Sequence, residues 1–226
     1  LQWEEVIEEV AQQIENYLNE GGEILHEEKN TVKIPVTVYA ESTPNPSAMK
    51  FVANKKVTDQ TLYFENIDSA KDAPMAKELF NFNYVKEVFM DENYISITKH
   101  ESTPWVEEVM EIRGFIKSYL EGEKPILGPT FNAKGQDSSN PIDHNWNETE
   151  QEIVRILEEY VKPAVASDGG NIIFDSYEDA EKRVKVVLQG ACSGCPSSTF
   201  TLKNGIENIL KDMLPGKVEL VEAING

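Results

Sequence analysis

The chain has 226 residues, with 21 Lys and Arg against 40 Asp and Glu, which gives a formal net charge of −19 at pH 7. This length suggests one or two domains that each bury a core without help from disulfides. The acidic excess argues against general binding to nucleic acid and against docking on an anionic membrane, because both depend on Lys and Arg. Two cysteines are too few for a disulfide-rich secreted scaffold, and no apolar run approaches the ~18–20 residues that span a bilayer.

The first predicted element is an amphipathic helix over residues 1–20, where apolar side chains recur at steps of three and four and Glu occupies other faces. The same pattern returns 102 residues later. The pairs in register are Trp3 with Trp105 and Tyr17-Leu18 with Tyr119-Leu120. We therefore expect residues 1–28 to be the closing helix of a truncated upstream copy of the domain that follows.

Residues 33–122 are predicted to form one α+β domain. Its predicted strands are 33–40, 49–53, 61–65, 86–90 and 94–98, and its predicted helices are 73–80 and 105–120. The first two strands are joined by a turn in which Asn45 stands between two prolines. For Asn45 we favour a rigid turn, with docking of a client protein as the alternative.

Residues 123–147 have the composition of a linker, rich in Pro and Gly and without periodicity. Residues 148–226 predict a second domain of α-β-β-α-β order, whose first helix we expect to end at Pro163. The fold class predicted for the whole chain is α+β, with two small α/β-sandwich-type domains joined by a flexible linker and preceded by the partial repeat helix.

Both cysteines, Cys192 and Cys195, lie between a predicted strand and a predicted helix. Free N–H groups and the helix dipole at such a position should favour thiolate over thiol. Gly190 and Gly194 would let the backbone approach a bulky ligand and donate N–H groups to sulfur. A second unusual segment, Asp168-Gly169-Gly170, predicts a sharp turn; we favour a purely structural turn, with support of the cysteine loop as the alternative.

The C-x-x-C spacing fits three chemistries: a dithiol oxidoreductase, a zinc site and an iron–sulfur cluster. One chain supplies two of the four thiolates that an iron–sulfur cluster uses. Its three histidines are distant in sequence from the cysteines, and we interpret them as solvated surface residues. If a metal binds here, the simplest route to four sulfurs is a symmetric dimer in which two loops meet.

Two segments around this loop resemble a known family. The residues VKPAVASDGGN (161–171) and GACSGCPSSTFTLKNGIE (190–207) resemble the C-terminal domain of NifU/Nfu iron–sulfur proteins, and STPNPSAMKF (42–51) resembles the N-terminal domain that accompanies it. The resemblance implies that Cys192 and Cys195 bind a [4Fe–4S] cluster held between two subunits, and whether a [2Fe–2S] form is populated stays open.

On this basis we expect a non-catalytic scaffold or carrier that passes the cluster to apo-proteins. Its expected partners are a second copy of the chain, client apo-iron–sulfur proteins and upstream cluster-assembly proteins, and its expected location is the cytoplasm. The alternatives are a thiol–disulfide oxidoreductase that uses the C-x-x-C pair and a structural zinc-bridged dimer.

Overall fold

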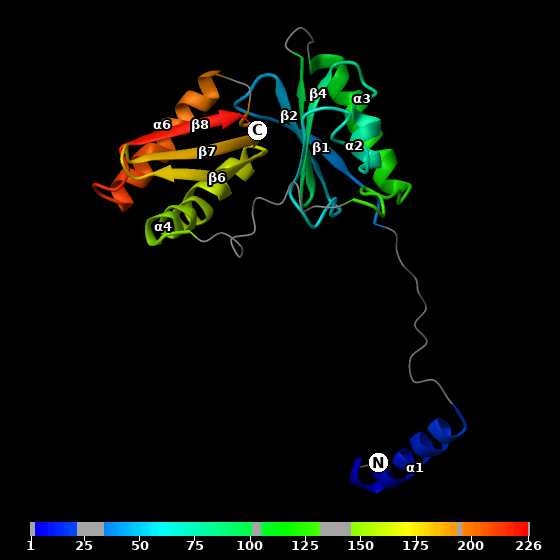
Figure 1. Cartoon of the computed structure of the whole chain (residues 1–226). Helices are drawn as coiled ribbons and strands as arrows, with labels where there is room; N and C mark the ends of the chain where they lie inside the picture. Colours follow the sequence, from blue (N-terminus) through cyan, green and yellow to red (C-terminus); the bar gives the residue numbers. More distant parts are fainter. Residues whose placement is uncertain (1–2, 22–33, 101–104, 132–145, 194–195, 226) are drawn as a thin grey trace. The chain divides into compact units, whose positions relative to one another are not determined.

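The computed structural model describes residues 3–21, 34–100, 105–131, 146–193 and 196–225, with residues 3–5 and 196–198 described by their backbone alone. The chain divides into two units, residues 1–35 and residues 36–226. The first unit contains helix α1 (Trp3–Asn19), in blue in Figure 1, and its apolar residues Ile7, Ile14, Tyr17 and Leu18 are exposed. Among the helices described, none combines the length and the apolar character needed to cross a membrane.

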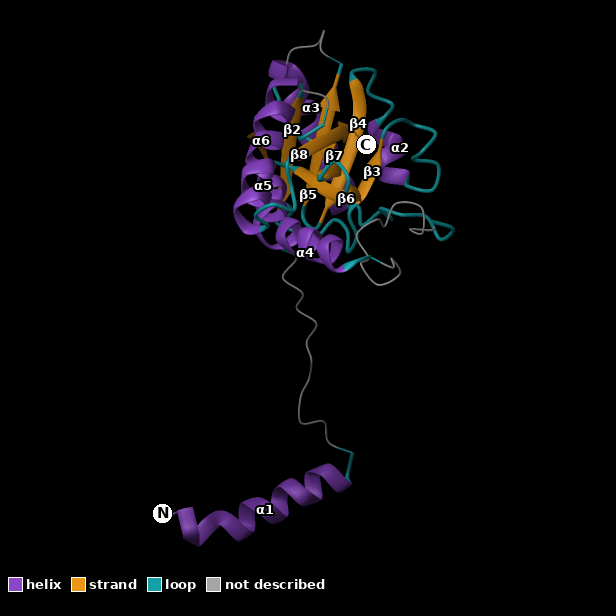
Figure 2. Ribbon diagram, turned by 60° about the vertical axis from the view of Figure 1, so that its left-hand side comes forward, coloured by secondary structure: helices purple, strands orange, loops and turns teal. Residues whose placement is uncertain are grey.

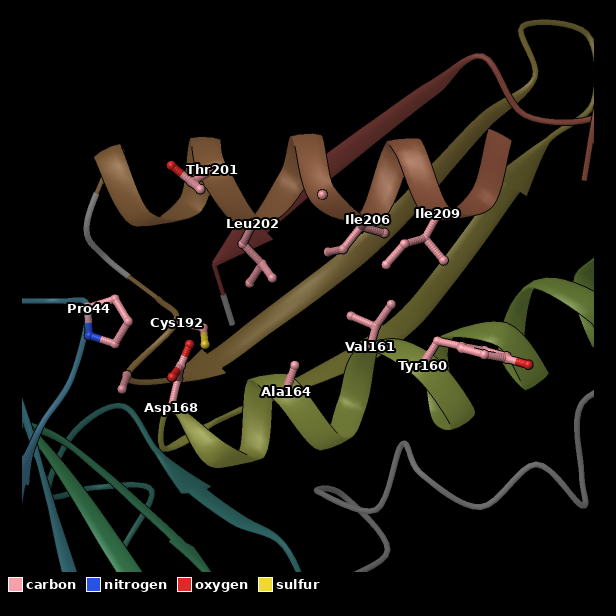
Figure 3. A pocket seen from close by; sticks show the side chains of 12 residues that line it. Pro44, Tyr160, Val161, Ala164, Asp168, Cys192, Thr201, Leu202, Ile206 and Ile209 are labelled. Atoms are coloured by element: carbon pink, nitrogen blue, oxygen red, sulfur yellow. The ribbon is translucent and has the colours of Figure 1, made fainter. Parts of the chain in front are cut away.

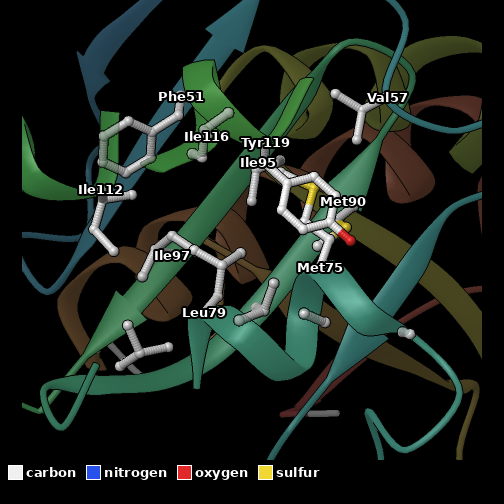
Figure 4. Packing of buried hydrophobic residues seen from close by; sticks show 14 of the residues in the cluster. Phe51, Val57, Met75, Leu79, Met90, Ile95, Ile97, Ile112, Ile116 and Tyr119 are labelled. Carbon is white, nitrogen blue, oxygen red and sulfur yellow. The ribbon is translucent and has the colours of Figure 1, made fainter. Parts of the chain in front are cut away.

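The second unit begins with a five-stranded antiparallel sheet in the order β1-β2-β5-β4-β3. The strands are β1 (Val38–Ser42), β2 (Ala48–Ala53), β3 (Leu62–Phe64), β4 (Val85–Asp91) and β5 (Tyr94–Lys99). Helices α2 (Pro74–Leu79) and α3 (Trp105–Glu121) bury their apolar residues against one face of this sheet. Figure 4 shows Met75 and Leu79 of α2 and Ile112 and Ile116 of α3 packed around Phe51, Ile95 and Ile97 of the strands.

Side chains alternate between the two faces of a strand, so the opposite face of this sheet carries a different set of residues. The strand register aligns five of them in one row across the sheet: Glu41, Lys50, Ser96, Phe89 and Tyr63. We call this face, which is turned away from α2 and α3, the outer face. A neighbouring row contains Tyr39, Val52 and Tyr94.

The C-terminal part of the same unit has a three-stranded sheet in the order β6-β7-β8, in which β6 and β7 are antiparallel and β7 and β8 are parallel. Its strands are β6 (Gly170–Glu178), β7 (Arg183–Gly190) and β8 (Leu220–Asn225). Its helical elements are α4 (Glu148–Ile156), the π-helical turn η3 (Leu157–Val161), α5 (Lys162–Ser167) and α6 (Pro196–Met213). Figure 2 shows α4, α5 and α6 lying together on one side of the strands, where they enclose the second core.

The first helix of this part starts as its sequence requires but does not end where we expected. Asn147 and Glu150 form a capping box that satisfies free N–H groups at the start of α4. The expected end at Pro163 is wrong, because the chain passes through the π-helical turn η3 and continues as α5. Pro163 then stands in the first turn of α5, directly after the π-helical turn.

The fold class predicted from sequence is confirmed, since helices and two sheets form an α+β protein. Strands β4 and β5 contact β7, so the two sheets touch each other within the second unit. Part of the segment predicted as linker packs on the first sheet: Ile126, Leu127 and Phe131 lie against its core. Residues 132–145 of that predicted linker lie outside the described residues.

Candidate cluster-binding site

The first half of the cysteine loop is held between two glycine-containing turns. Strand β7 ends at Gly190, whose φ of +66° is a conformation that glycine adopts without steric penalty. The N–H of Ala191 donates to the carbonyl of Gly169 at 3.1 Å, so the loop lies directly against the Asp168-Gly169-Gly170 turn. A Cβ atom on Gly170 would lie 2.6 Å from Cys192 Sγ. The turn therefore positions the cysteine loop, which was the less favoured of the two interpretations made from sequence.

Cys192 is a free thiol that is 8% exposed and packs in the core of the C-terminal part. Burial, with a smaller contribution from the charge of Asp168, raises the pKa of Cys192 to about 12. This direction is opposite to the thiolate that we expected at this residue, because burial disfavours the charged form of the sulfur. Cys195 and Gly194, the other predicted loop residues, lie outside the described residues.

We expect the Cys192 thiol to stay protonated in the folded apo-protein up to strongly alkaline pH. In a Cys195→Ser variant, the ultraviolet absorbance of thiolate should be absent at pH 9, and it should appear near the usual pKa of about 8.5 once the chain is unfolded in denaturant. Because the folded pKa is the higher one, this proton contributes stability that is complete below the unfolded pKa and is lost as pH rises towards the folded value. A native titration near pH 8 would contradict the burial of this thiol.

An apolar pocket of about 520 Å³ opens beside Cys192. Its walls come mainly from η3, α5 and α6, and the residues that form them include Val161, Ala164, Leu202, Ile206 and Ile209. Figure 3 shows Cys192, Asp168 and Pro44 together at one end of the pocket. Pro44 belongs to the turn before β2, so the N-terminal part of the unit contributes to the surroundings of the cysteine.

Two polar side chains of the N-terminal part hold the residue next to Cys192. Asn45 Nδ2 donates to the carbonyl of Ser193 at 2.8 Å, and Ser193 Oγ donates to Glu87 Oε2 at 3.0 Å. Asn45 and Ser193 are each 1% exposed. Asn45 also keeps its own turn, since its Oδ1 accepts from the N–H of Ser47 at 2.9 Å. From the sequence we favoured only this turn role for Asn45, and we missed Glu87. The alternation of side chains along a strand places Glu87 on one face of the sheet but does not identify its partner.

Lys50 makes a third connection from the outer face. Its Nζ donates to the carbonyls of Ala166 at 3.1 Å and Ser167 at 2.9 Å, the last residues of α5. The same ammonium group lies 4.4 Å from the centre of the Tyr94 ring. A cation at the carbonyl end of a helix is favourable, so Lys50 stabilises the helix that leads into the Asp168 turn.

The described side chains offer few metal ligands. No group of three or more His, Cys, Asp or Glu residues gathers among them. Of the three histidines, His100 is described and exposed, while His26 and His144 lie outside the described residues. Within the described part, Cys192 is the one thiol, and thiolate sulfur is the donor that iron–sulfur clusters use.

Comparison with known proteins finds two family matches. Residues 38–123 match the family described as "Scaffold protein Nfu/NifU N terminal", and residues 153–221 match the "NifU-like domain". The chain is 34% identical over 174 residues to "NifU-like protein 4, mitochondrial" of Arabidopsis thaliana, which covers 76% of this chain and 61% of that protein. It is 34% identical over 189 residues to "NFU1 iron-sulfur cluster scaffold homolog, mitochondrial" of Drosophila willistoni, which covers 83% of this chain and 63% of the relative.

The chain thus spans less than two thirds of the length of these relatives. Among solved structures, the solution structure of a NifU-like protein from Saccharomyces cerevisiae is 16% identical, with a TM-score of 0.39 over 48% of this chain and 98% of that one. The names of both curated relatives place them in mitochondria, which contradicts the cytoplasmic location that we expected for this chain.

Proposed function

The chain belongs to the NifU/Nfu family of iron–sulfur scaffold proteins, and from this premise we propose that it carries a [4Fe–4S] cluster between two subunits and passes it to apo-proteins. In this proposal Cys192 and Cys195 of each subunit bind the cluster as cargo, and the chain performs no catalysis. The family names support the scaffold role. We infer the cluster type, the bridging arrangement and the transfer.

The observation that carries the proposal is the position of Cys192 on a loop shaped by glycines. The chain has two cysteines, both in this loop, whereas a [4Fe–4S] cluster takes four thiolates. Two chains related by a two-fold axis would supply four sulfurs from two identical loops. Gly170 leaves the space in which Cys192 Sγ lies, and its missing side chain keeps the sulfur close to the loop backbone.

Transfer then needs only ligand exchange. A thiolate of the client forms a bond to iron as the bond from Cys192 breaks, and the proton of the client thiol passes to the sulfur that is released. The oxidation state of the iron does not change. The high pKa of Cys192 in the apo-protein, about 12, favours this release, because the freed sulfur takes up a proton readily and returns to its buried place.

The same pKa argues against the oxidoreductase alternative. A dithiol reductase attacks disulfides with a thiolate whose pKa is lowered, whereas burial raises the pKa of Cys192. A disulfide-reduction assay with a thiol donor should therefore show no turnover above that of the free donor.

Anaerobic reconstitution tests the proposal. The wild-type chain should bind about four iron and four sulfide per dimer, as one shared [4Fe–4S] cluster requires, and its mass in solution should double on loading. Cys192→Ser and Cys195→Ser should each lose the cluster, whereas His100→Ala, which removes an exposed histidine, should retain it. Full loading of either cysteine variant, a colourless zinc protein, or a monomer that holds a complete cluster would contradict the proposal.

A further inference from the structure

Part of the outer face of the five-stranded sheet is covered in this structure by the turns at Gly169 and Gly190, next to Cys192. We propose that this face is a receptor surface for the cysteine loop, occupied here by the chain's own loop, and that the loop must leave it before a cluster can be loaded. The second half of this statement rests on the proposed cluster function.

Apolar side chains on the outer face are buried. Val52, Tyr63, Phe89 and Tyr94 form a buried cluster, although α2 and α3 lie on the opposite face of the sheet. Phe89 is 1% exposed, and a Cβ atom on Gly190 would lie 2.9 Å from its ring. The loop backbone therefore packs directly on the aromatic surface, and exposure of this surface to water would be unfavourable.

The two turns fit the outer face only because Gly169 and Gly190 lack side chains. A Cβ atom on Gly169 would lie 2.6 Å from Ser96 Oγ and 3.3 Å from the side chain of Lys50. Gly190 meets Phe89 in the same row of the sheet. Three adjacent residues of that row, Lys50, Ser96 and Phe89, thus contact the turns at Gly169 and Gly190, which makes the fit specific to the cysteine loop.

Polar contacts also fix the register of the two surfaces. Asn45 and Glu87 bind the carbonyl and the hydroxyl of Ser193, and Lys50 binds the carbonyl end of α5. These bonds hold the residue that follows Cys192 and the helix that leads into the Asp168 turn. The Cys192 thiol itself is 8% exposed, so it must become more accessible before the loop of a second subunit can share a cluster with it.

The contact also contains a feature that favours its opening. Ser96 Oγ is buried at the contact and has no hydrogen-bond partner among the described atoms. A buried hydroxyl without a partner is destabilising, and separation of the two surfaces would return it to water. Apolar burial and a few hydrogen bonds therefore stabilise the closed state, and the buried Ser96 hydroxyl destabilises it. Such opposing contributions are expected of a contact that opens reversibly.

The test measures how fast iodoacetamide alkylates Cys192 in the full-length apo-chain. A Cys195→Ser background makes Cys192 the single thiol, because the chain has two cysteines. Phe89→Glu places a charge in the contact and should raise the alkylation rate about tenfold, since labelling proceeds through the open state. Asn45→Asp keeps the acceptor for Ser47 and loses the donor to Ser193, so it should raise the rate severalfold.

Two further variants serve as controls: one adds the same charge at an exposed site, and the other should change the alkylation rate in the opposite direction. Tyr39→Glu adds the same charge to an aromatic position of the outer face that is 53% exposed, and it should leave the rate unchanged. Ser96→Ala removes the hydroxyl without a partner and should slow alkylation by a few fold. Equal rates for Phe89→Glu and Tyr39→Glu would overturn the receptor surface. If circular dichroism shows that Phe89→Glu is unfolded, Asn45→Asp decides the question alone.

The second arm repeats the comparison with Cys195 restored and follows cluster uptake by its visible absorbance. Phe89→Glu and Asn45→Asp should load faster than wild type, and Ser96→Ala should load more slowly. If alkylation responds as expected but no variant takes up a cluster, the proposed function fails while the receptor surface stands. If all variants load at one rate although their alkylation rates differ, release of the loop does not control loading and that half of the proposal is wrong.

Discussion

Replacing Gly170 with alanine should displace the Cys192 thiol and destabilise the C-terminal part of the chain. The new Cβ atom would lie 2.6 Å from Cys192 Sγ and 2.7 Å from the carbonyl oxygen of Gln189. The carbonyl belongs to β7, which pairs with β6 at this point, so it cannot move without disturbing the strand ladder, and the thiol is the neighbour that moves. We expect the free energy of unfolding, measured by urea denaturation, to fall by about 1–3 kcal/mol.

The same variant should also bind less iron on reconstitution, because the sulfur is pushed out of the position it occupies beside the loop. Gly205→Ala is the matched control: Gly205 lies exposed within α6, and an added Cβ atom would meet no heavy atom within 4 Å. That substitution should raise the free energy of unfolding by about 0.5–1 kcal/mol, since alanine favours a helix over glycine. Equal effects of the two substitutions would show that Gly170 is not confined by Cys192.

Phe64→Ala should have the larger effect on stability. Phe64 is fully buried in β3, and its ring lies edge-to-face with Phe131 at a centroid distance of 6.4 Å. Truncation leaves a cavity in the first core and removes the ring on which Phe131 packs, so the free energy of unfolding should fall by about 3–5 kcal/mol. Loss of this contact should also make the segment around Phe131 more sensitive to limited proteolysis.

Phe200→Ala is the comparison for this variant, because Phe200 is 65% exposed on α6. Its change in stability should stay within about 0.5 kcal/mol. A loss below about 1 kcal/mol for Phe64→Ala would mean that the first core repacks around the cavity, against the usual cost of truncating a buried phenylalanine.

Elements with a clear period were predicted from sequence within one or two residues. Helix α3 was expected over 105–120 and covers Trp105–Glu121, and β5 was expected over 94–98 and covers Tyr94–Lys99. The first strand was expected to start at residue 33, but β1 starts at Val38. Pro35 cannot donate to a strand ladder, and pairing begins only where Val38 meets Ala53 of β2.

For the candidate site, features that depend on neighbouring residues could be predicted from the sequence, whereas contacts between distant residues could not. A glycine-rich segment between a strand and a helix is visible in the sequence around Cys192, and so is the sharp turn at Gly169. The burial of the Cys192 thiol, which raises its pKa, is not visible there, because it depends on packing in the core of its own domain. The partners Asn45 and Glu87 lie 148 and 106 residues away from Ser193, and alternation alone does not tell which face of a sheet a second domain will cover.

Lys50 gives this protein a sensitivity to electrolyte. Its ammonium group meets the carbonyl end of α5, and the attraction between a charge and a helix dipole weakens as ionic strength rises. Helix α5 ends at Ser167, so the carbonyl of this residue lies at the negative end of the helix dipole. Added salt should therefore fray α5 from its carbonyl end. Asp168 and its neighbours should then be held less firmly at high salt concentration than at low salt concentration.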